Sequence, residues 1–196
     1  MSGLAVFGYG SLVSRASVAA TLGHDGAAPV PARLAGWRRR WSLVRDNARA
    51  EKGFEPIEGD PFDFCLGLNL EPAPDAADDE WPNGALIELT AAELDRLDLR
   101  ELRYDRVEVT GDVRTAGTAS FNAVYAYTAK PQNFTAEPPP RSVVLASYLR
   151  ACEAAFAELG DDELVAFGRT TVPVPVPVVE ARLVRDEIPP GNPRAW

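Results

Sequence analysis

The segment Phe7-Gly8-Tyr9-Gly10-Ser11-Leu12 constrains the fold more than any other part of this sequence. It follows a short apolar run, residues 4–7, that predicts a buried strand, and it precedes residues 14–22, where Ser14 or Ser17 could cap a short helix. Two glycines around one tyrosine allow a tight turn in which main-chain N–H groups face a ligand with no side chain in between. Such a turn could bind a carboxylate or a carbonyl oxygen. A purely structural turn beneath a packed strand is the alternative.

The glycine spacing in this segment excludes two phosphate-binding loops. A dinucleotide-binding fingerprint needs glycines at its first, third and sixth positions, and counting from Gly8 the sixth position is Val13. A nucleoside-triphosphate loop needs a Gly-Lys-Ser/Thr ending, which the segment lacks. The turn therefore does not predict nucleotide binding.

Length and charge narrow the class of protein. We expect one domain, residues 1–196, because the chain is too short for two domains of ordinary size, and no apolar run is long enough to cross a bilayer. The formal net charge of −9 argues against binding to nucleic acid or to an anionic membrane. The basic cluster Arg38-Arg39-Arg40 lies between Trp37 and Trp41, and we expect it on the exposed face of a strand.

The cysteines and the single histidine exclude several kinds of site. Cys65 and Cys152 have no metal or redox spacing and predict buried thiols in a reducing compartment. The first residues lack the basic segment of a signal peptide, which with the cysteines predicts a soluble cytoplasmic protein. His24 lies in a turn-like segment, which disfavours histidine-based triads and metal sites, so we expect no metal and acid–base chemistry on a carboxylate.

Strands dominate the predicted elements. Thr90 and Glu93 form a capping box that predicts a helix up to about Arg100. The three prolines of residues 172–177 exclude a central strand and predict a Pro-rich C-terminal arm, residues 172–196, for which recognition by a proline-binding partner is an alternative role. We expect strands within 29–44, 62–70, 85–89, 107–109 and 121–128, loops at 46–60 and 72–81, and the longest helix over 142–159, ended by Gly160. The spacing of the strands favours a mixed or antiparallel closed sheet.

Glu101 is the acidic residue that chemistry singles out. It follows the C-terminal end of the predicted helix, where carbonyl dipoles disfavour a carboxylate, so burial there would raise its pKa and suit it to act as a general base and then an acid. Arg100, Arg103 and Arg106 are close in sequence and could instead form an ion pair with it. A structural salt bridge is therefore the alternative for Glu101.

The glycine segment, together with Leu97-Asp98-Leu99-Arg100-Glu101 and Tyr104-Asp105-Arg106-Val107, resembles the gamma-glutamylcyclotransferase-like superfamily, which includes ChaC and AIG2-type proteins. Residues 33–38 and 83–85 resemble segments of the same family, and the resemblance extends from Ala5 to about Leu159. It implies an α+β fold, a small mixed β-barrel with helices packed on the outside and a cavity at its mouth.

The resemblance also implies a reaction. The α-amine of a γ-glutamyl compound attacks its own γ-carbonyl, which releases 5-oxoproline and a free amine, as in glutathione metabolism, without any cofactor. The positions that match the family imply that Glu101 is the catalytic base and acid, and that Tyr9, Gly10, Ser11 and Leu12 bind the γ-glutamyl group. Tyr125 resembles a substrate-binding tyrosine of some relatives, with a core aromatic as the alternative.

Two points stay open from the sequence. Relatives act on glutathione, other γ-glutamyl amino acids, γ-glutamylamines or γ-glutamyl-capped antibiotic precursors, and residues 46–60 and 131–140, which could set this choice, match no part of the family. The spacing from Glu101 to Tyr104 is closer to the AIG2 type. A noncatalytic protein of the same fold that binds a small molecule is the alternative to an enzyme.

Overall fold

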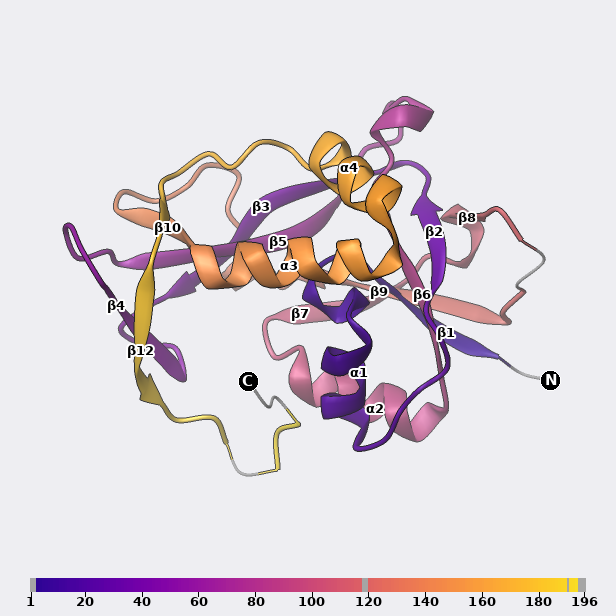
Figure 1. Cartoon of the computed structure of the whole chain (residues 1–196), viewed down its shortest axis with the longest axis horizontal. Helices are drawn as coiled ribbons and strands as arrows, with labels where there is room; N and C mark the ends of the chain where they lie inside the picture. The colour runs from indigo at the N-terminus through magenta and orange to yellow at the C-terminus, as the bar shows by residue number, and fades with distance from the viewer. Residues whose placement is uncertain (1–2, 118–119, 190, 194–196) are drawn as a thin grey trace.

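The larger of the sheets is mixed and has the N-terminal strand near its centre. The computed structural model describes residues 3–117, 120–189 and 191–193. Within them, the pairing of β1 with β9 is parallel and the other pairings in this sheet are antiparallel. The six strands, in spatial order, are β7 (Tyr104–Glu108), β9 (Ala123–Ala129), β1 (Leu4–Gly8), β6 (Asn83–Leu89), β2 (Val30–Leu34) and β8 (Val113–Thr115) (Figure 1).

A second sheet is built on a long antiparallel pair. Its strands, in spatial order, are β11 (Val178–Val179), β10 (Ser142–Leu145), β5 (Phe64–Pro72) and β3 (Trp37–Asp46), and β10 runs parallel to both of its neighbours. A third, two-stranded ribbon pairs β4 (Lys52–Pro56) with β12 (Ala181–Asp186), and Figure 1 shows it at one side of the molecule. We call this pair the β4–β12 ribbon.

In the part of the chain that the structure describes, four α-helices lie outside the sheets. They are α1 (Arg15–Leu22), α2 (Ala91–Arg100), α3 (Ala146–Leu159) and α4 (Asp161–Thr170), and four one-turn 3-10 helices are η1 (Ser11–Val13), η2 (Asp78–Glu80), η3 (Thr110–Asp112) and η4 (Pro131–Asn133). Helix α1 packs on α2, and α3 packs on α4 and on η1. No helix in the described ranges is long and apolar enough to span a membrane.

Apolar residues from both large sheets form one core. Phe7 of β1, Leu68 of β5 and Phe156 of α3 are at most 1% exposed and belong to the same cluster. On β1 the side chains alternate, as a strand requires, so that Val6 belongs to a second cluster with Leu97 of α2. Strand β1 therefore has both faces covered, and its end is held between the core and α2.

The structure confirms the predicted mixed α+β fold with helices outside. The described strands pair into three separate sheets, however, and do not close into one barrel. The strand, glycine turn and helix of the N-terminal segment are present as β1, η1 and α1. That residues 1–196 form a single domain stays a prediction.

Three segments differ from what the sequence predicts. Residues 46–60 are not a plain loop, because 52–56 form β4, and the predicted helix from Ser142 begins at Ala146, because 142–145 pair with β5 as β10. The long helix does end at Gly160, as predicted, but a further helix that the sequence analysis did not predict, α4, follows it directly. For the two strands the deciding contact is with a segment distant in sequence.

The C-terminal arm is part of the folded structure as far as it is described. Val174 and Val176 pack against the main core, and the Val144 N–H donates to the Pro177 carbonyl at 3.0 Å. Residues 181–186 then form β12. Residues 190 and 194–196 of the predicted arm lie outside the described residues.

Candidate active site

The glycine turn, residues 8–12, leaves the end of β1 and enters η1. The Val13 N–H donates to the Gly10 carbonyl at 3.0 Å, so the N–H groups of residues 11 and 12 precede the first hydrogen bond of this 3-10 helix. The Tyr9 side chain is buried, and its hydroxyl donates to the Tyr127 carbonyl at 2.6 Å. The turn is thereby fixed to β9 on one side.

Close backbone packing holds the turn against β6. A Cβ built on Gly84 would lie 2.2 Å from the Gly8 carbonyl oxygen and 2.7 Å from the Phe7 ring, which are distances that real Cβ atoms do not adopt. A Cβ on Gly8 would lie 3.1 Å from Ile87. Glycine at position 84 is therefore required for β6 to approach the turn this closely.

Glu101 is the C-terminal cap of α2, and its side chain is 15% exposed. The capping box predicted at Thr90 and Glu93 starts this helix. The length of α2 then places Glu101 at a cavity that the glycine turn also lines. The Glu101 N–H donates to the Leu97 carbonyl at 3.0 Å, and the Glu101 carbonyl accepts from the Tyr104 N–H at 2.9 Å. The backbone on both sides of Glu101 is thus fixed.

Arg100 orients the Glu101 carboxylate. Its Nε lies 3.1 Å from Glu101 Oε1, and its Nη1 donates to the Thr21 hydroxyl at 2.6 Å and to the Ser17 carbonyl at 3.0 Å, both on α1. The salt bridge that the sequence offered as the alternative for Glu101 is therefore present, with Arg100 as the partner. An ion pair to a fixed arginine and a place beside a cavity are compatible with each other.

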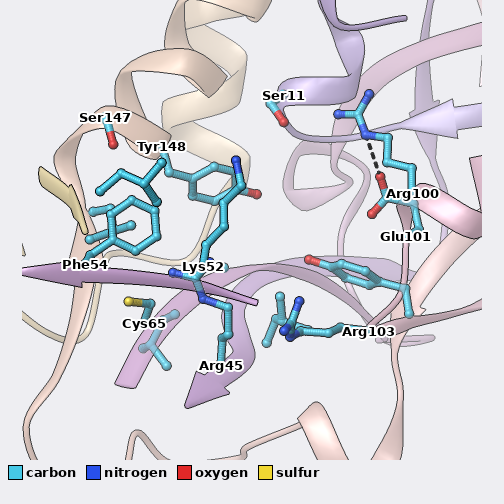
Figure 2. Close-up of a pocket in the computed structure, with 16 residues that line it drawn as sticks. Ser11, Arg45, Lys52, Phe54, Cys65, Arg100, Glu101, Arg103, Ser147 and Tyr148 are labelled. Carbon is cyan, nitrogen blue, oxygen red and sulfur yellow. Dashed lines mark ion pairs between the residues drawn. The ribbon is translucent and has the colours of Figure 1, made fainter. Parts of the chain in front are cut away.

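Two adjoining cavities meet at Glu101. Figure 2 shows the residues that line the larger one. The larger cavity has a volume of about 300 Å³, which is the lower end of the range for small-molecule sites, and the smaller has about 50 Å³, enough for a few atoms. The smaller cavity lies against the glycine turn. Residues that line both are Ser11, Arg100, Glu101, Tyr104 and Tyr148.

Four tyrosines line the smaller cavity. The Tyr104 hydroxyl donates to the Leu68 carbonyl at 2.7 Å, and the Tyr127 hydroxyl donates to Asp98 Oδ1 at 2.6 Å. Burial raises the pKa of Tyr9 and of Tyr148 well above the usual value near 10, so these hydroxyls stay protonated at neutral pH. The wall of this cavity thus combines tyrosine rings with the glycine turn and the Arg100–Glu101 ion pair.

The structure brings most of the sequence-predicted site residues together. Tyr9, Gly10 and Leu12 line the smaller cavity, and Ser11 and Glu101 line both. Tyr125 lies outside both cavities, on β9, where the Arg106 guanidinium sits 5.1 Å from its ring centre. The position of Tyr125 fits the core-aromatic alternative.

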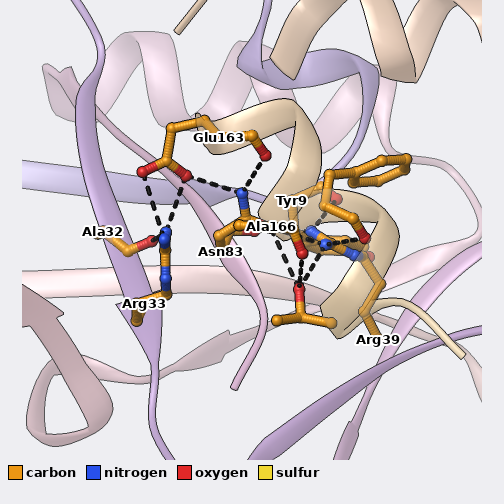
Figure 3. Close-up of polar contacts among 9 residues, drawn as sticks. Tyr9, Ala32, Arg33, Arg39, Asn83, Glu163 and Ala166 are labelled. Carbon is orange, nitrogen blue, oxygen red and sulfur yellow. Dashed lines mark hydrogen bonds and ion pairs between the residues drawn. The ribbon is translucent and has the colours of Figure 1, made fainter. Parts of the chain in front are cut away.

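A buried arginine supports the glycine turn from behind (Figure 3). Arg39 is 0% exposed, although the sequence led us to expect Arg38-Arg39-Arg40 on an exposed face. Its Nη1 donates to the Tyr9 carbonyl at 3.2 Å and to the Asn83 carbonyl at 2.6 Å. The prediction was wrong for Arg39 because Trp37, Arg39 and Trp41 share one face of β3 at a period of two, and that face is turned inward.

The charge of Arg39 is compensated by dipoles. Its Nη2 donates to Asn83 Oδ1 at 2.8 Å, to the Thr170 hydroxyl at 3.0 Å and to the Phe167 carbonyl at 3.3 Å, and its Nε donates to the Thr171 hydroxyl at 2.7 Å. The groups of Phe167, Thr170 and Thr171 lie at the C-terminal end of α4, where the helix dipole favours a cation. Burial lowers the pKa of Arg39 to about 9, so it remains charged at neutral pH.

Sequence reasoning missed the far end of the larger cavity. Arg45 of β3, Lys52 and Phe54 of β4, and Leu183 of β12 line it. Residues 46–60 were suspected of setting the choice of substrate, and 52 and 54 do lie at the cavity, whereas none of residues 131–140 lines it. The arginine–tryptophan alternation of residues 37–41 gave no signal for Arg45, because the register of β3 against β5 shifts between Arg40 and Leu43.

Cys65 and Cys152 are both buried, as predicted, and burial raises the pKa of Cys152 to about 12. No group of three or more histidine, cysteine or acidic side chains suited to a metal ion occurs in the described ranges. The expectation that the site uses no metal or cofactor stays a prediction.

The sequence matches no protein-family model, and comparison with curated proteins finds no significant match. Solved structures do match. One named gamma-glutamyl cyclotransferase is 14% identical, with a TM-score of 0.55 over 91% of this chain and 94% of its own. YkqA from Bacillus subtilis is 19% identical, with a TM-score of 0.57 over 90% of this chain, which spans 56% of YkqA.

A third structure, a gamma-glutamyl cyclotransferase specific to glutathione from yeast, is 16% identical, with a TM-score of 0.53 over 87% of this chain and 96% of its own. At sequence identities this low, the comparison shows that this chain shares the fold of these structures.

Proposed function

We propose that this chain, which has the fold of the gamma-glutamyl cyclotransferases, catalyses the release of 5-oxoproline and a free amine from a γ-glutamyl compound. The observation that carries the proposal is the place of Glu101. It is a fixed, largely buried carboxylate at the junction of two cavities, and the glycine turn that leads into η1 lines the smaller of them.

In the proposed complex the γ-glutamyl group lies against the glycine turn. The smaller cavity holds its carboxylate end, and the γ-carbonyl lies next to Glu101 where the cavities meet. The leaving amine then extends into the larger cavity. Holding both reacting groups of one curled molecule together contributes to the rate through effective concentration.

Glu101 moves the protons in this reaction. Its carboxylate takes a proton from the α-ammonium group, and the α-nitrogen attacks the γ-carbonyl carbon to form the new C–N bond of the ring. The old bond from the γ-carbon to the leaving nitrogen then breaks, and Glu101 returns its proton to that nitrogen. Overall the α-nitrogen loses two protons and the leaving nitrogen gains two, so the reaction consumes no proton.

Two groups assist Glu101 in this proposal. Main-chain N–H groups of the glycine turn stabilise the γ-carbonyl oxygen as it gains negative charge. Arg100 is a positioning residue, because its bonds to α1 and to Glu101 keep the carboxylate directed at the junction of the cavities.

Substitution of Glu101 by glutamine tests the assignment. The amide keeps the shape of the side chain but cannot take up the proton, so we expect Glu101→Gln to lower kcat for 5-oxoproline release by about 10²–10⁴-fold with modest change in ligand affinity. Mass spectrometry of 5-oxoproline from a panel of glutathione, γ-glutamyl dipeptides and γ-glutamylamines measures it.

The matched control is Glu88→Gln, an exposed glutamate on β6 that lines neither cavity, which should retain full activity. Turnover by Glu101→Gln equal to the wild type would overturn the proposed role. Binding of γ-glutamyl ligands by the wild type without any product would favour a noncatalytic binding protein of this fold.

A further inference from the structure

The larger cavity carries an excess of positive charge. Among the residues that line it are four cationic side chains, Arg45, Lys52, Arg100 and Arg103, and one carboxylate, Glu101. The whole chain has a formal net charge of −9. A cationic cavity in an acidic protein points to a ligand group of negative charge, since the rest of the surface repels such a group and the cavity attracts it.

Three of the four cations have a carboxylate partner within the protein. Arg100 pairs with Glu101 at 3.1 Å, Lys52 lies 3.5 Å from Asp186, and Arg103 pairs with Glu51. These pairs neutralise much of the local charge. Arg45 is the one of the four cations that has no such carboxylate partner among the described residues.

Arg45 differs from the other three cations. Among the described residues no carboxylate oxygen lies within 4.0 Å of its side-chain nitrogens, and its Nε is buried without a hydrogen-bond partner. Its guanidinium lies 4.9 Å from the ring centre of Phe54. The guanidinium also interacts with the Cys65 side chain. Neither contact satisfies the Nε–H group, and a buried donor without an acceptor costs free energy.

Arg45 also lies at the end of the larger cavity into which the proposed reaction directs the leaving amine. Figure 2 shows Arg45, Phe54 and Cys65 on one side and Glu101 and Arg100 on the other. With the γ-carbonyl at Glu101, the part of the substrate beyond the bond that breaks extends toward Arg45. The γ-glutamyl group itself is at the opposite end, in the smaller cavity.

We propose that the amine released by this protein carries a carboxylate and that Arg45 binds it. This inference rests on the proposed function and specifies its substrate class: a γ-glutamyl amino acid or peptide, and not a neutral γ-glutamylamine. A guanidinium suits this task because its fork of N–H donors matches the two oxygens of a carboxylate.

Three substrates that differ in a single group test the proposal. γ-Glutamylalanine has the carboxylate, γ-glutamylalaninamide replaces it by a neutral amide, and γ-glutamylethylamine lacks it. Because a charged hydrogen-bond pair is lost, we expect kcat/KM for 5-oxoproline release to be about tenfold or more higher for the acid than for either neutral compound.

Arg45→Met should bring the ratio of kcat/KM for acid over amide close to one, and Arg45→Lys, which keeps the charge but not the fork, should give an intermediate ratio. The matched control is Arg49→Met, whose side chain is 88% exposed and lines neither cavity, and it should keep the wild-type ratio. A wild-type ratio near one, or a ratio that Arg45→Met leaves unchanged, overturns the proposal.

Failure of the proposed function gives a different result. If none of the three compounds yields 5-oxoproline, calorimetric titration of the wild type and Arg45→Met with the same compounds measures the carboxylate preference directly. Tighter binding of γ-glutamylalanine than of its amide, lost in Arg45→Met, supports the carboxylate site without the reaction. Equal affinities, or no binding of γ-glutamylalanine, overturn it.

Discussion

At the scale of single residues, Arg39 shows how a charged side chain can organise a site without lining it. It joins the Tyr9 carbonyl, the main-chain and side-chain carbonyl oxygens of Asn83, and the end of α4. Asn83 in turn donates to Glu163, which pairs with Arg33 at 2.8 Å. The carbonyl of the glycine turn thus belongs to one buried polar network that reaches α4.

Replacement of Arg39 by methionine should be severely destabilising. The variant keeps much of the volume but leaves the acceptors of Tyr9, Asn83 and α4 buried without donors, so we expect a loss of at least about 3 kcal/mol in the free energy of unfolding. Urea denaturation followed by circular dichroism measures it.

The neighbouring Arg38→Met is the control for this prediction. Its side chain is 43% exposed and lies 3.7 Å from Glu80, a surface pair whose loss should cost no more than about 1 kcal/mol. Similar losses in the two variants would contradict the assignment of a buried, structural role to Arg39.

At the scale of elements, local signals predicted α2 well. The Thr90 hydroxyl accepts from the Glu93 N–H at 3.3 Å, and the Glu93 carboxylate accepts from the Thr90 N–H at 2.7 Å, as the capping box predicts. The helix ends at Arg100, and Glu101 is its C-terminal cap. Because the cap fixes the start of α2, the sequence also predicted the environment of Glu101 as a helix terminus next to arginines.

Local signals failed where a distant strand decides the structure. Residues 142–145 fit the helical apolar pattern of α3, yet pairing with β5 makes them a strand. Residues 52–56 are polar and turn-rich, and their partner β12 is more than a hundred residues away, so nothing nearby indicates a strand. The far end of the larger cavity depends on these long-range pairs, which is why the sequence did not predict it.

The approach of β6 to β1 gives a prediction at this scale. Gly84→Ala places a Cβ against the Gly8 carbonyl, so the strands must separate or the turn must move, and we expect a loss of about 1–3 kcal/mol or more in the free energy of unfolding. Thermal unfolding measures it.

Gly168→Ala is the contrasting control. Gly168 is an exposed residue of α4 with no atom within 4 Å of a built Cβ, and alanine in a helix interior should stabilise by about 0.5–1 kcal/mol. If both alanine substitutions stabilised the protein, there would be space for a Cβ between β6 and the glycine turn, and the close approach would not require glycine at position 84.

At the scale of the whole molecule, buried tyrosines should limit stability at high pH. Burial raises the pKa of Tyr9, Tyr127 and Tyr148 above the usual value near 10. Above about pH 10 the unfolded chain therefore releases protons that the folded chain keeps, and each tyrosine lowers the free energy of unfolding by about 1.4 kcal/mol per pH unit.

We expect this loss to begin above pH 10 and to unfold the protein cooperatively. Tyrosinate absorbance at 295 nm for these residues should rise together with the loss of far-ultraviolet circular dichroism. Tyr148→Phe, which removes one ionising group and keeps the ring, should make stability fall less steeply with pH. Full ionisation near pH 10 with an unchanged dichroism spectrum would contradict the role of burial.

The β4–β12 ribbon has a consequence for how the protein is made. Ser11 and Leu183 line the same cavity although they lie near opposite ends of the described chain, and β12 is the element that pairs with β4 beside Lys52. During synthesis on the ribosome the glycine turn and Glu101 emerge first, and the wall formed by β12 is added long afterwards. A nascent chain that stops before residue 181 contains the proposed catalytic glutamate without the enclosure in which it would act.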